Sequence, residues 1–186
     1  GGASASESGI VLWRESSGGA TGLTLDRQGR VLVCETQARR VTRTEKDGTI
    51  TVLADRFDGK RLNHPADLVH AIDGSTYFTD PTVGELPDGE SFEQPSMVFQ
   101  IRRNGELNPV ATDFEQPTGM AFSPNQRIIY IADAARNHIR AFDIEGDGAL
   151  VNSRVFATLQ SGQGIGVGGI DRLVRQRVLR WTRRNL

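Results

Sequence analysis

Short stretches in which apolar and polar residues alternate occur three times along the chain, at residues 21–35, 66–80 and 118–133. Each stretch has a small-residue start, one alternating run, a polar turn and a second alternating run that ends on an acidic residue. Alternation with a period of two is typical of β-strands with one buried face. Each stretch therefore predicts a β-hairpin, and turn residues such as Asp73 and Gly74 favour the positive φ angles of tight turns.

Two further alternating segments follow each predicted hairpin, so the repeated unit is expected to be a sheet of four strands. The three hairpins begin 45 and 52 residues apart, and four-stranded propeller blades typically span about 40 to 50 residues. The sequence therefore predicts an all-β chain that forms a partial β-propeller. We expect blades near residues 21–54, 66–114 and 118–159, within a propeller region that covers residues 10–163 and includes an outer strand of a preceding blade at residues 10–13.

The composition narrows the class of protein. Among 186 residues, 22 Lys and Arg balance 23 Asp and Glu, so there is no overall basic excess for a nucleic-acid partner. No apolar run approaches the roughly 18 to 20 residues of a membrane span. Residues 1–9 lack the basic and apolar regions of a signal peptide, so we expect a disordered leader and a cytoplasmic location. The single Cys34 cannot form an internal disulfide, and without an adjacent His a buried structural thiol is favoured over a nucleophile.

The length leaves two arrangements open. Propellers close with about four to eight blades, whereas this sequence predicts three. Either the chain is a fragment of a longer propeller, or two copies form a homodimer that closes a six-bladed ring.

Residues 59–69, 73–81 and 116–124 resemble the gluconolactonase, regucalcin and senescence-marker family of six-bladed lactonase-type propellers. The resemblance covers about residues 10 to 163. It implies a hydrolase for sugar lactones or related esters, with a small-molecule substrate and a divalent metal, most often calcium, at one mouth of a central channel.

The chain departs from this family at its characteristic asparagines. Thr21, Ala66 and Thr118 stand where the family motifs place asparagine at the starts of inner strands. Calcium prefers six to eight oxygen ligands, and an alanine side chain supplies none. The departures weaken the inherited metal site, so we expect a lactonase-like protein whose activity and cation are both open.

The remaining candidates lie around these positions. Asp67 and Asn63 are the predicted catalytic residues, and Asp67 and Asp133 are the predicted metal ligands. His64, Thr118 and Thr21 are the predicted substrate-binding residues.

Acidic residues end all three predicted hairpins, at Glu35, Asp80 and Asp133. They could converge near the channel as a cation site or an acid/base pair. An acid that recurs in every blade is also suited to a recurring backbone requirement, namely accepting amide hydrogen bonds at a strand end. The repetition favours the second interpretation, because catalytic sites are usually asymmetric.

Residues 164–186 form a tail that is first rich in glycine and then rich in arginine. Gly164, Gly166 and Gly169 match a dinucleotide fingerprint, but the chain contains neither the later acidic residue nor a βαβ unit, so no nucleotide site is predicted. Apolar residues at helical spacing are consistent with a short amphipathic helix. A truncated or frameshifted lactonase-like gene is the alternative explanation.

Two classes of function follow. The first is a metal-dependent lactone or ester hydrolase, as the resemblance implies. The second is a non-catalytic propeller module that binds a small ligand or a partner chain, as the lost asparagines favour. Fold alone does not decide between them.

Overall fold

The structure of the chain is a computed structural model that describes residue 14 and residues 16–158. The predicted leader, the strand expected at residues 10–13 and the tail at residues 164–186 lie outside the described residues. Within the described part, there is no helix with the length and apolar character that a membrane span requires.

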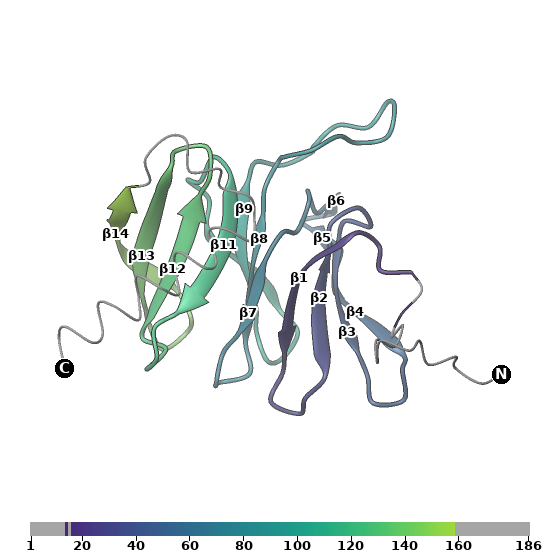
Figure 1. Cartoon of the computed structure of the whole chain (residues 1–186), viewed down its shortest axis with the longest axis horizontal. Helices are drawn as coiled ribbons and strands as arrows, with labels where there is room; N and C mark the ends of the chain where they lie inside the picture. The colour runs from purple at the N-terminus through teal and green to yellow at the C-terminus, as the bar shows by residue number, and fades with distance from the viewer. Residues whose placement is uncertain (1–13, 15, 159–186) are drawn as a thin grey trace, which may run out of the picture.

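Three four-stranded antiparallel sheets follow one another along the chain and stand side by side in space (Figure 1). In each sheet, neighbours in sequence are neighbours in space, as in a propeller blade. The prediction of an all-β propeller with three blades is confirmed. The first sheet contains β1 (Ala20–Leu25), β2 (Val31–Glu35), β3 (Arg40–Thr44) and β4 (Ile50–Ala54); the second contains β7 (Leu68–His70), β8 (Thr76–Asp80), β9 (Met97–Ile101) and β10 (Leu107–Ala111); the third contains β11 (Pro117–Phe122), β12 (Ile128–Asp133), β13 (His138–Ile144) and β14 (Leu150–Thr158).

A short additional hairpin, β5 (Arg56–Phe57) and β6 (Lys60–Arg61), lies between the first two sheets. This hairpin is not among the elements predicted from the sequence. Asp58 and Gly59 form its turn with φ angles of 50° and 77°. A two-residue turn with both φ angles positive strongly prefers sequences such as Asp-Gly. The Asp58-Gly59 pair is therefore the feature of the sequence that indicates this hairpin.

The middle sheet packs against a neighbour on each of its faces. Because side chains alternate along a strand, Phe78 of β8 enters the core shared with the first sheet, and Tyr77 enters the core shared with the third. All five residues of β8 are therefore buried. Cys34 is fully buried in the first of these cores, and burial raises the pKa of its thiol well above the usual value.

The first sheet has a contrasting outer face. Leu23 and Leu25 of β1 are 58% and 60% exposed, and Val52 of β4 is also exposed. In the propeller fold this face meets a further blade. The homodimer that would provide one stays a prediction.

The first strands of the three sheets, β1, β7 and β11, lie next to one another and run in the same direction. Contacts between residues 21 and 66 and between residues 67 and 120 join their starting ends. Contacts between residues 27 and 72 and between residues 72 and 126 join the turns that follow them. We call the starting end the mouth and the turn end the far end.

Candidate functional site

The mouth is built from side chains that bind the backbone of the next blade. Thr21 Oγ1 donates to Ala66 O at 2.8 Å, and Thr79 Oγ1 donates to Thr118 O at 2.9 Å. These bonds bring the predicted site positions Thr21 and Thr118 to the same end of the inner strands. The side chain of Thr21 is thereby committed to a contact between blades.

Asp67 occupies the centre of this arrangement. It directly precedes β7 and is partly exposed. Its Oδ1 accepts a hydrogen bond from Leu68 N at 2.9 Å, and its Oδ2 accepts one from Met120 N in the third sheet at 2.8 Å. Amide donors on both oxygens orient the carboxylate and stabilise its negative charge. Asp67 is thus a rigidly held carboxylate at the mouth.

Asn63 lies in the interior, below the mouth. Its side chain is fully buried, and Nδ2 donates to Asp80 O at 3.2 Å and to Pro95 O at 3.0 Å. These contacts anchor the loop that precedes β9. The amide of Asn63 is therefore bonded to backbone carbonyls in the interior, whereas Asp67 is partly exposed.

His64 lines a cavity of about 360 Å³ beside the mouth, together with residues of the loop between β8 and β9. Its ring packs edge-on against Phe92, and its Nδ1 contacts Val83 O. A carbonyl oxygen only accepts hydrogen bonds, so Nδ1 is the donor in this contact. The other ring nitrogen, Nε2, can bond a substrate hydroxyl.

The acids that end the second strands contact their own blades. Asp133 accepts hydrogen bonds from Glu115 N and Gln116 N at 3.0 and 3.1 Å and forms an ion pair with Arg136. Asp80 accepts one from Asn63 N at 2.8 Å. Both arrangements match the structural interpretation, in which the acid serves the segment that enters the inner strand.

Glu35 differs from the other two acids. Its buried carboxylate accepts hydrogen bonds from the side chains of Arg14, Arg40 and Thr42, each at 2.7 Å. Burial raises the pKa of this carboxyl, but these side-chain donors together outweigh the burial and leave the pKa below its usual value.

Several polar atoms near the mouth are buried without a hydrogen-bond partner among the described residues. They are Asp80 Oδ1, Asn63 Oδ1 and Thr118 Oγ1. Burial raises the pKa of Asp80 to about 7, despite the Asn63 amide and the charge of Arg39, which both lower it. Sequence reasoning missed this environment, because the residues that bury Asp80 come from separate parts of the chain.

The acidic and histidine side chains of the described residues do not cluster as a calcium site would require. Within residues 16–158, no group of three or more His, Cys, Asp or Glu side chains could hold a metal ion. Asp133 is fully buried and paired with Arg136, and the pairing of Asp133 with Asp67 as metal ligands stays a prediction. Calcium requires six to eight oxygens. The described residues do not form a family-type metal centre by themselves.

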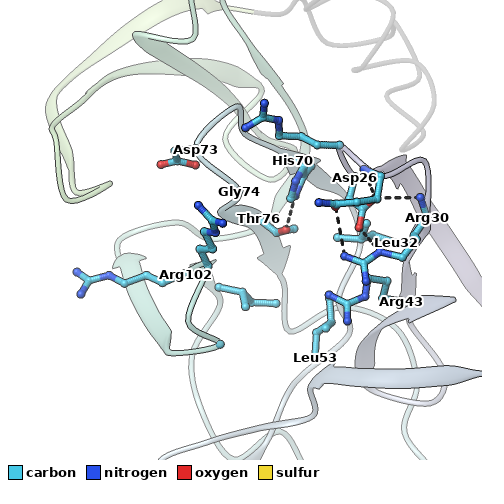
Figure 2. A pocket seen from close by; sticks show the side chains of 15 residues that line it. Asp26, Arg30, Leu32, Arg43, Leu53, His70, Asp73, Gly74, Thr76 and Arg102 are labelled. Atoms are coloured by element: carbon cyan, nitrogen blue, oxygen red, sulfur yellow. Dashed lines mark hydrogen bonds and ion pairs between the residues drawn. The ribbon is translucent and has the colours of Figure 1, made fainter. Parts of the chain in front are cut away.

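A second cavity of about 550 Å³ opens at the far end, between the first and second sheets (Figure 2). Arginines dominate its polar lining, and His70 lies against it with Nδ1 at 2.9 Å from Thr76 Oγ1. Its lining residues come from the turns and strands of two blades, so no single sequence motif marks it.

The model of the family described as "SMP-30/Gluconolactonase/LRE-like region" matches residues 4–173. The chain belongs to this family. The resemblance that the sequence motifs indicated is confirmed.

Two gluconolactonases and one lyase are similar to this chain. A gluconolactonase from Zymomonas mobilis is 27% identical over 136 residues, which cover 70% of this chain and 38% of that protein. The structure of a gluconolactonase from Xanthomonas campestris is 36% identical, with a TM-score of 0.67, over 77% of this chain and 50% of that one. A Staphylococcus aureus virginiamycin B lyase, 19% identical over 80% of this chain and 44% of that one, with a TM-score of 0.57, shares the fold. This chain thus spans half or less of the length of these relatives.

Proposed function

We propose that this chain contributes three blades to a hydrolase that opens small lactones or related cyclic esters at the mouth. The family match and the gluconolactonases among its relatives support this class of substrate. The observation that carries the proposal is Asp67, a partly exposed carboxylate held by amides from two blades.

In the proposed reaction, water adds to the carbonyl carbon of the lactone and the ring C–O bond breaks, which gives an open-chain hydroxy acid. Asp67 takes the proton of the attacking water and returns it to the departing ring oxygen, so protons balance over the cycle. Binding of substrate hydroxyls is assigned to His64 Nε2 and Thr118. No step is assigned to Asn63, whose amide is already bonded to the backbone.

Asp67→Asn tests this assignment. The amide keeps an acceptor for the backbone of β11 but cannot take a proton, so we expect the rate of gluconolactone hydrolysis to fall at least about 100-fold. The rate is measured by pH-stat titration, with thermal unfolding as the check on folding. Asp113→Asn is the matched control, because Asp113 is an exposed acid paired with Arg140.

We expect the opposite result for Asp80→Ala: its thermal stability should fall, whereas its activity per folded molecule should be retained. Equal loss of activity in the Asp67 and Asp113 variants would contradict the role of Asp67. If the parent chain binds a lactone without hydrolysing it, the non-catalytic module is the better description.

Family members are generally metal-dependent, but the described donors of this chain fall short of a calcium site. We therefore expect calcium titrated into the EDTA-treated chain to bind no more tightly than about the millimolar range of weak calcium sites. Isothermal titration calorimetry measures this directly. A micromolar dissociation constant would contradict the expectation and would indicate a ligand set that these residues do not provide.

A further inference from the structure

The far-end cavity lies opposite the mouth and takes no part in the proposed hydrolysis. It is bounded by the turns after β1, β7 and β9, and its volume of about 550 Å³ is within the range of small-molecule sites. We propose that this cavity binds a phosphorylated, hydroxyl-bearing small molecule of about the size of a sugar phosphate.

Two of its arginines are already neutralised. Arg30 forms ion pairs with Asp26 at 2.7 Å and with Glu45 at 2.8 Å, and Arg43 pairs with Glu45 at 2.6 Å. These side chains form one closed network on the first sheet, and Figure 2 shows Arg30 and Arg43 beside Asp26. They shape one wall of the cavity. Their two positive charges are balanced by the carboxylates of Asp26 and Glu45, so this wall adds no net charge for a ligand.

Three other arginines keep unused donors. Arg103 makes no hydrogen bond or ion pair within residues 16–158, and Arg27 bonds only the carbonyl of Ile72. Arg102 Nε is buried and finds no acceptor in the described part of the chain, and its Nη1 lies 3.4 Å from the exposed Glu106. The lining acid on this side is Asp73, whose Oδ1 accepts from Ser75. Donors therefore exceed acceptors, and guanidinium groups match the geometry of phosphate oxygens.

The rest of the lining suits the remainder of such a ligand. His70 and Thr76 offer hydrogen-bonding groups near the centre of the cavity (Figure 2). Burial lowers the pKa of His70, although Asp26 and Asp73 raise it while Arg27 and Arg30 lower it. The neutral imidazole can bond a ligand hydroxyl. The apolar residues Leu32, Leu53 and Ile101 complete the lining beneath these polar groups.

The test is a calorimetric titration at constant ionic strength with glucose 6-phosphate, inorganic phosphate and glucose. We expect the ester to bind most tightly, phosphate more weakly and glucose without measurable heat. The double variant R27Q/R103Q should weaken ester binding at least about tenfold, the effect of 1.4 kcal/mol. Arg103→Gln alone should weaken it less, and it removes a guanidinium without any bond in the described part of the chain.

Arg56→Gln is the matched control, because Arg56 is also exposed and donates to a backbone carbonyl, at Gly59 outside the cavity. An equal loss in this variant would reduce the effect to general electrostatics and overturn the proposal. Equal affinities for phosphate and ester, or no ester binding, would also overturn it. Asp67→Asn should leave ester binding unchanged, so failure of the hydrolase assignment and failure of this site can be told apart.

Discussion

Asp80→Asn is expected to stabilise the protein above pH 7. Burial raises the pKa of Asp80 to about 7 in the folded state, against 3.8 for an unperturbed carboxyl. The unfolded chain therefore releases this proton near pH 4, whereas the folded chain keeps it until about pH 7. Stability from this group is complete below pH 4 and is lost as the pH rises to 7, a loss of about 4 kcal/mol at 1.36 kcal/mol per pKa unit.

Asparagine at this position has no titratable group, and its side-chain amide can donate hydrogen bonds. Asn63 Oδ1 and Asp80 Oδ1 are both buried without a hydrogen-bond donor among the described residues. Urea unfolding of the parent and of Asp80→Asn at pH 4, 6 and 8 measures the effect. We expect nearly equal stability at pH 4 and a gain of about 4 kcal/mol for the variant at pH 8. Parallel pH curves for the two proteins would contradict it.

Asp133→Asn is the control at the equivalent position of the third blade. Asp133 pairs with Arg136 and accepts bonds from two backbone amides, so loss of its charge should lower stability. The two substitutions are therefore expected to act in opposite directions, although both residues end a second strand.

Gly22→Ala is expected to destabilise the junction of the first two blades by about 2 to 3 kcal/mol, the upper part of the ~1–3 kcal/mol range typical of an overpacked core. A Cβ at Gly22 would lie 2.7 Å from Asp67 Cα and 2.8 Å from Ala66 O. These are backbone atoms, so the clash is relieved only if the two inner strands move apart. Such a movement displaces Asp67 as well, so the rate of lactone hydrolysis per folded molecule should fall.

Gly29→Ala distinguishes the effect of a steric clash from the effect of a strained backbone conformation. Gly29 has a φ angle of 74° with no atom within 4 Å of an added Cβ, so its substitution should cost only about 1 kcal/mol, the low end of the cost of a left-handed backbone. Activity per folded molecule should stay unchanged in this variant. Chemical unfolding and hydrolysis assays on both variants test the pair, and equal costs would mean that close approach at Gly22 is unimportant.

The sequence was sufficient to predict the three sheets because each blade repeats one local pattern. Alternation and turn residues act over a few positions, and the packing of one blade on the next follows from the fold. The middle sheet shows a limit of that pattern, because polar residues in a strand do not always mark an exposed face. Thr76 and Thr79 of β8 are polar, yet both are buried, since this strand is covered on both faces.

The candidate site was less predictable. The sequence indicated that Thr21, Ala66 and Thr118 lie at one end, because they hold equivalent places in successive blades, and Asp67 directly follows Ala66. It did not indicate that Asn63 is buried or that Thr79 bonds the third blade. These contacts join residues that are far apart in the chain, and nothing in a local pattern records them.

The hydrogen bonds between blades are distributed unequally between the mouth and the far end. At the mouth, Thr21 and Thr36 tie the first blade to the second through the carbonyls of Ala66 and Pro65. At the far end, the exposed bond of Arg27 to Ile72 spans the same gap, whereas the buried Tyr77 hydroxyl fastens the second blade to the third at Gly148. The first two blades are thus tied by two threonines at the mouth but by one exposed arginine at the far end. We therefore expect any separation of these blades to begin at the far end, beside the arginine-lined cavity, and hydrogen exchange of the amides around each end would measure it.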